Sequence, residues 1–222
     1  MRPWILCGLW LLGATFSAIV RAEPVRELTF IEVRTDATER SRTILRKHAA
    51  ALNQHASRPR ALVLEETARP EKFVLLESAE GAADGSRQNT PPLTEQLSAL
   101  LTAPPDHRTH REFGDPAASQ ANAGKSTSLF VITHLDLAPP ERAKGEAALA
   151  RLVTEARRSA GNLLFAVWQQ TDRANHFNLV AVWSSRKSFD DFAAGAAARE
   201  FRASVASLLG SPYDERLYRR AE

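Results

Sequence analysis

Apolar residues in the second half of the chain follow a helical period in two segments and a strand-like pattern in four. Residues 141–159 carry apolar side chains at helical spacing, which predicts a helix with one buried face. A second helix is predicted to begin at a capping box formed by Ser188 and Asp191 and to end at Gly210. Strands are predicted at 129–137, 163–169, 177–183 and 213–219.

The first half repeats this order with weaker signals. Strands are predicted at 28–33, 61–66, 73–77 and 108–113, with helices at 38–56 and from Thr90-Pro91 onward. Two short segments match at corresponding places: 69–73 resembles 173–177, and 106–111 resembles 214–219. We interpret the repeated order, together with these matches, as an internal duplication.

Residues 114–128 separate the two halves and contain no large apolar residue, so they are predicted to be a connector between units at 24–113 and 129–220. Each unit has the order βαββαβ, which gives a four-stranded antiparallel sheet with both helices on one face. The other face is half apolar and must be covered. We therefore predict an α+β fold in which two ferredoxin-like units pack sheet to sheet as a barrel-like pseudo-dimer within one chain.

The N-terminus has the pattern of a secretory signal. Arg2 precedes an uncharged apolar run at 4–20, and small residues at Val20 and Ala22 suit a cleavage site. We predict a signal peptide at 1–22 and export to the periplasm or the medium, with an uncleaved anchor as the alternative. No later stretch is long enough for a membrane helix.

Composition excludes several classes of function. The single cysteine, Cys7, lies in the predicted signal, so the exported chain would have no disulfide, catalytic thiolate or cysteine-ligated metal. The net charge is only +3 with basic and acidic residues interspersed, which does not indicate nucleic-acid binding. Neither a complete phosphate loop nor a hydrolase elbow occurs, and the histidines do not have metal-site spacing.

Four segments of the second half carry a likeness to a known family: 161–163, 172–177, Trp183-Ser184 and 210–219. In these segments the second half resembles the antibiotic biosynthesis monooxygenase family of the dimeric α/β-barrel superfamily. The resemblance implies an intrachain dimeric α/β barrel with an apolar pocket between sheet and helices. There a quinol or related small aromatic would meet oxygen without a cofactor. Some relatives bind and open haem instead.

The sequence departs from the family at several polar positions. A glutamate two residues before the strand-end tryptophan is replaced by Ala181, a histidine early in the second helix by Phe192, and a further histidine by alanine near Ala197. The first half keeps Glu77 but has Ala79 in place of the tryptophan. Two functions remain open, an exported cofactor-independent monooxygenase and a non-catalytic ligand-binding module, and haem opening ranks below both.

Four aromatic residues are candidates for the pocket. Phe177 and Trp183 share one face of their strand, where they form either a pocket wall or plain core. Trp168 either stacks on a ligand or fills the interface between units, and Phe192 occupies the place of the family histidine.

Two residues are candidates for catalysis. His134 lies on a strand and faces either the pocket or the barrel interior, where an imidazole suits acid–base work. Asn162 follows Gly161 at a helix end and serves either the turn or a ligand. His176 falls in the turn before its strand and is expected at the surface. No residue is proposed as a metal ligand, and association with further chains stays open.

Overall fold

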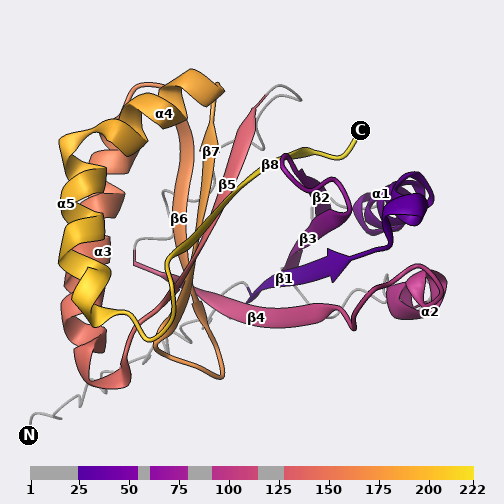
Figure 1. Cartoon of the computed structure of the whole chain (residues 1–222), viewed down its shortest axis with the longest axis horizontal. Coiled ribbons are helices and arrows are strands. Elements are labelled where there is room, and N and C mark those ends of the chain that lie inside the picture. Colours follow the sequence, from indigo (N-terminus) through magenta and orange to yellow (C-terminus); the bar gives the residue numbers. More distant parts are fainter. Residues whose placement is uncertain (1–24, 55–60, 80–91, 115–127) are drawn as a thin grey trace, which may run out of the picture.

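A computed structural model of the chain describes residues 25–54, 61–79, 92–114 and 128–222 (Figure 1). The predicted signal peptide, nearly all of the predicted connector and the predicted helix start at Thr90-Pro91 lie outside these residues. None of the helices within them is long and apolar enough to cross a membrane.

Two successive sets of elements follow the same order. Unit 1 contains β1 (Val25–Glu32), α1 (Thr38–Asn53), β2 (Ala61–Glu66), β3 (Lys72–Ala79), α2 (Leu93–Leu97) and β4 (Asp106–Phe113). Unit 2 contains β5 (Leu129–Asp136), α3 (Arg142–Arg158), β6 (Asn162–Gln170), β7 (His176–Trp183), α4 (Arg186–Ala194), α5 (Ala196–Val205) and β8 (Asp214–Arg220).

The eight strands form one closed antiparallel barrel in the order β1-β3-β2-β8-β5-β7-β6-β4. Each unit supplies a sheet of ferredoxin-like order, β4-β1-β3-β2 or β8-β5-β7-β6, and the edge pairs β2–β8 and β4–β6 join the two sheets. Figure 1 shows α3, α4 and α5 outside one sheet and α1 and α2 outside the other. The predicted fold, two ferredoxin-like units in an intrachain barrel, is confirmed.

Alternate side chains along a strand belong to different hydrophobic cores, one beneath the helices and one inside the barrel. Along β7, Phe177 and Trp183 face the helices of unit 2, whereas Val180 and Val182 face the barrel interior. The interior core also includes Leu28, Leu64, Val74, Phe130, Ile132, Ala166, Trp168 and Tyr218, which come from both units. The bare faces of the two sheets therefore cover each other, as the hydrophobic pattern requires.

Matching local structures occur at equivalent places in the two units. The turn before β3 is closed by a 2.9 Å bond from Lys72 N to Arg69 O, and the turn before β7 by one of 2.9 Å from His176 N to Arg173 O. The strands β4 and β8 both start with an Asp-x-Arg ion pair, Asp106–Arg108 and Asp214–Arg216. These pairs come from the segments that matched in sequence.

The second helical region of unit 2 differs from its prediction. Its first helix begins at Arg186, and the N-cap is Ser185, whose side chain accepts a 3.1 Å bond from Ser188 N. Ser185 has the extended backbone that an N-cap requires, and Asp191 forms an ion pair with Lys187. The predicted capping box at Ser188 was therefore wrong by three residues.

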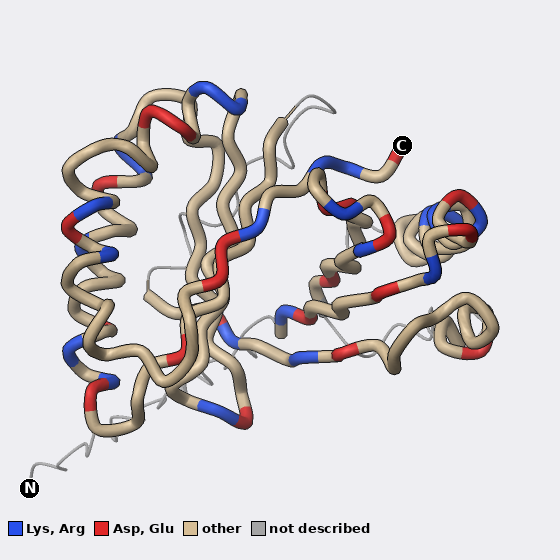
Figure 2. The backbone as a smooth tube through the Cα atoms, viewed as in Figure 1, with Lys and Arg blue, Asp and Glu red and all other residues tan. Residues whose placement is uncertain are grey.

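The region is also two helices instead of one. Gly195 has extended dihedral angles between α4 and α5, which ends the first helix and starts the second. In unit 1 the corresponding helix α2 has only five described residues. Figure 2 shows both basic and acidic residues on the helices α1, α3, α4 and α5, which agrees with the balanced charge of the sequence.

Candidate functional site

A small cavity lies in unit 2 between the sheet and the helices. The strands β5, β6, β7 and β8 line one side, and α3, α4 and α5 line the other. Its volume of about 20 Å³ suffices for one water-sized molecule. The apolar lining consists of Val131, Leu152, Phe165, Leu179, Ala181, Trp183, Phe189, Phe192, Ala193, Ala198 and Phe201.

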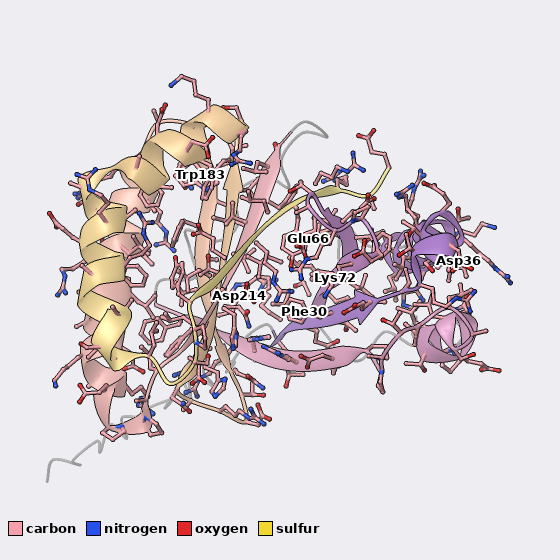
Figure 3. The ribbon with its side chains drawn as sticks, viewed as in Figure 1. Phe30, Asp36, Glu66, Lys72, Trp183 and Asp214 are labelled. Carbon is pink, nitrogen blue, oxygen red and sulfur yellow. The ribbon has the colours of Figure 1, made fainter. Side chains whose placement is uncertain are left out.

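Aromatic rings form the wall of this cavity beneath α4. Trp183, beside α4 in Figure 3, is 0% exposed, and its ring lies 5.0 Å from that of Phe192 and 6.3 Å from that of Phe189. Phe165 on β6 meets Phe192 at 6.3 Å. The described residues provide no hydrogen-bond partner for the buried Trp183 Nε1. The wall can therefore stack on a flat ligand and offers one unused donor.

The opposite end of the cavity is polar. Tyr213 Oη donates a 3.2 Å hydrogen bond to Glu215 Oε2, and Thr133 Oγ1 donates one of 3.4 Å to the same oxygen. Thr133 and Glu215 are paired across β5 and β8, so the sheet register fixes this arrangement. The guanidinium of Arg202 also lines this end and is held by the carbonyl of Ala193. Burial raises the pKa of the Tyr213 hydroxyl, and the Glu215 carboxylate adds to that shift.

The pocket candidates from the sequence fall into three places. Trp183 and Phe192 line the cavity together. Phe177 shares the face of Trp183 but packs edge-on against Phe113 at 5.4 Å, outside the cavity lining. Trp168 is 4% exposed and belongs to the barrel interior, so of the two alternatives for this residue it fills the interface between units.

The catalytic candidates do not converge on the cavity. His134 faces the barrel interior, where its Nδ1 lies 3.3 Å from Arg108 Nη1 of unit 1. Burial lowers the pKa of His134, and the nearby charges of Arg108 and His176 lower it further. Asn162 uses its amide to donate a 3.1 Å bond to the carbonyl of Leu164, so the side chain serves the irregular start of β6.

The expectation of a surface position for His176 was wrong. His176 is the first residue of β7, and its side chain is 15% exposed. Its Nε2 lies 3.2 Å from Asp136 Oδ1, and its ring lies 5.7 Å from that of His134. The turn places this residue inward because β7 begins one position earlier than the apolar run suggested.

Sequence reasoning missed the polar end of the cavity. Thr133 is a polar residue on the strand face shared by Val131 and Leu135, and this interruption of the apolar pattern was the available signal. Glu215 and Tyr213 gave no comparable signal because their closeness to Thr133 depends on how β8 pairs with β5. Ala181, which replaces the family glutamate, lines the cavity, so the carboxylate here comes from a different strand.

The comparison with known families agrees with this geometry. A family model for antibiotic biosynthesis monooxygenases (ABM) matches residues 128–204. This segment is an ABM domain. It contains β5, β6, β7 and the helices over the cavity, whereas Tyr213 and Glu215 lie beyond the matched residues.

Solved structures support the fold of the whole chain around the ABM domain. A proposed monooxygenase from Fusobacterium nucleatum has a TM-score of 0.73 at 10% identity, covering 90% of this chain and 94% of its own. One from Lactobacillus acidophilus has a TM-score of 0.67 at 10% identity, with 90% and 95% covered. An anthrone oxidase-like protein has a TM-score of 0.61 at 10% identity, with 89% and 91% covered. No curated protein matches the chain.

Proposed function

We propose that the cavity of the ABM domain binds a quinol or related small aromatic and that the protein oxygenates it without a cofactor. The observation that carries the proposal is the cavity itself, which combines an aromatic wall at Trp183 with one polar end at Tyr213 and Glu215. Such a lining suits a flat ring that bears a hydroxyl group, because the ring packs on the wall while the hydroxyl meets polar partners.

The reaction needs no external reductant. A hydroquinone supplies two electrons and two protons, so hydroquinone plus O₂ gives a hydroxyquinone plus water with all atoms balanced. One oxygen atom enters the ring and the other leaves as water. The part of the protein would be to bind the ring, to exclude bulk water and to ionise the phenol, since a phenolate gives an electron to O₂ more readily than a phenol.

Ligand entry requires movement, because the cavity volume of about 20 Å³ is smaller than any aromatic ring system. The side chains of Phe189 and Phe192 that narrow it come from α4, a short helix that ends at Gly195. Arg199 and Arg202 of α5 donate hydrogen bonds to the last carbonyls of α4. We expect displacement of α4 about Gly195 to open the cavity, with these two arginines restoring the closed position.

Oxygen uptake by the purified protein with a panel of hydroquinones tests the function. We expect turnover above autoxidation in buffer and, under ¹⁸O₂, one labelled atom in the organic product. Uptake no faster than in buffer across the panel would count against oxygenation.

Two tryptophans of unit 2 provide matched variants for this assay. Trp183→Phe is expected to lower kcat/KM by about tenfold, because stacking partners contribute roughly 1 kcal/mol. Trp168→Phe removes the same volume from a similarly buried residue that faces the barrel interior, and its rate should stay within about twofold of the parent protein. Equal losses in the two variants would argue against the cavity as the reaction site.

A non-catalytic binding module is the second candidate, favoured by Ala181 and Phe192 in the cavity lining, which supply no acid–base group. It predicts saturable binding of the same aromatic compounds with neither oxygen uptake nor label in the product.

We also propose that the protein is exported, on the basis of the signal-like sequence at 1–22. Sequencing the N-terminus of protein recovered from cell fractions tests this. A cytoplasmic protein that retains residues 1–22 would contradict it.

A further inference from the structure

We infer that Tyr213 and Glu215 form a proton relay that takes the phenolic proton of the substrate from the cavity to the solvent. The inference rests on the proposed function and assigns catalytic residues to it. Neither residue lies in the matched ABM segment. Tyr213 lies just before β8, and Glu215 lies on it.

The two side chains connect the interior to the exterior. Both residues line the cavity, but Tyr213 is partly buried whereas Glu215 is exposed to solvent. The 3.2 Å hydrogen bond from Tyr213 Oη to Glu215 Oε2 joins them. Thr133, which is 3% exposed, donates to the same carboxylate oxygen at 3.4 Å and thereby orients it. The carboxylate is thus held beside the hydroxyl and remains open to water on its other side.

The direction of proton transfer follows from this arrangement. The Tyr213 hydroxyl is protonated at neutral pH, as any tyrosine is, and burial raises its pKa further, so it can donate. A substrate phenol bound against Tyr213 Oη gives its proton to that oxygen as the tyrosine proton passes to Glu215. Tyr213 ends unchanged, Glu215 becomes a carboxylic acid, and the substrate becomes a phenolate. Glu215 then releases the proton to water.

The charge of Arg202 favours the phenolate once Glu215 has taken up the proton and lost its negative charge. Arg202 lines the cavity, and its positive charge opposes the rise in the pKa of Tyr213, so it favours an anion there. Glu215 is the single carboxylate among the described residues that line the cavity. Its neighbour Asp214, labelled in Figure 3, forms a 2.6 Å ion pair with Arg216 on the other face of β8. That face leads to the barrel interior and not to the cavity.

Variants of the relay test the inference by comparing the turnover of a protonated substrate with that of an ionised one. Glu215→Gln and Tyr213→Phe are each expected to lower kcat for an unsubstituted hydroquinone at pH 7 by about 100-fold, the usual contribution of a positioned proton acceptor. The loss should shrink to within about threefold for a halogenated hydroquinone that is already ionised at the assay pH, because no proton then has to leave. Asp214→Asn is the matched control and should keep the parent rate.

The outcomes separate the relay from the function on which it rests. If the parent protein oxidises no hydroquinone, the proposed function fails. If the parent protein is active and both variants keep its rate and its pH profile, the function stands and the relay is overturned. A loss of equal size with the ionised substrate would also overturn it, because that loss would reflect structure instead of proton transfer. Since Glu215 is exposed, Glu215→Gln is expected to fold even if Tyr213→Phe does not.

Discussion

Replacement of Glu65 by alanine is expected to lower the free energy of unfolding by about 3 kcal/mol. The Glu65 side chain is 2% exposed and accepts hydrogen bonds of 2.8 Å from Arg42 of α1 and 2.8 Å from Arg219 of β8. Arg219 belongs to unit 2, so the carboxylate joins both units at the β2–β8 seam. Without the Glu65 carboxylate, the guanidinium groups of Arg42 and Arg219 each lose a hydrogen-bond acceptor, and Arg42 is largely buried.

Urea denaturation measures this effect, and Glu39→Ala provides the control. Glu39 pairs with the same Arg42 but is 83% exposed, so its removal should change the free energy of unfolding by less than about 1 kcal/mol. Similar destabilisation by both substitutions would show that the seam does not depend on the buried carboxylate.

Acidification from pH 6.5 to pH 4 is expected to remove about 3 kcal/mol of stability through His110 alone. His110 is 0% exposed in the barrel interior, and burial lowers its pKa from 6.5 to about 4. Between these values the unfolded chain binds a proton that the folded protein does not. Stability is therefore full above pH 6.5 and falls as the pH falls through this window. Protonation would also disrupt the 2.8 Å contact between His110 Nε2 and the Asn178 amide nitrogen.

The pH dependence of the urea midpoint in the parent protein and in His110→Gln isolates this contribution. Burial also lowers the pKa values of His48, His134 and His176, so both proteins should lose stability in acid. The parent protein should lose more. The difference between the free energies of unfolding of the two proteins should therefore change by about 3 kcal/mol between pH 6.5 and pH 4. Parallel curves would mean that His110 is protonated in the folded state.

Sequence periodicity predicted the architecture well because the elements of the second half have strong local signals and the first half repeats their order. The alternation along β7 separated Phe177 and Trp183 from Val180 and Val182, and the structure places them in different cores. The sheet face without helices was correctly identified as a surface that a second sheet must cover. The duplication and the export of the chain remain predictions.

The candidate site was harder to predict because both faces of the central strands β5 and β7 are largely apolar. A period of two shows that His134 shares a face with Ile132, but it does not show which face borders the cavity. The structure assigns that face to the barrel interior. The polar end at Tyr213 and Glu215 depends on the β5–β8 register, which joins residues far apart in the chain. Local patterns carry no information about such a pairing.

The most direct test of the account is a fluorescence titration that reports on the cavity alone. The chain has four tryptophans, and Trp168→Phe leaves Trp183 as the single one after residue 22. Under anaerobic conditions, a hydroquinone should quench Trp183 saturably in this variant, whereas Trp168 in the Trp183→Phe variant should show no saturable change. Saturable quenching of Trp168 with none at Trp183 would contradict the proposal that the aromatic ligand binds between the sheet and helices of unit 2.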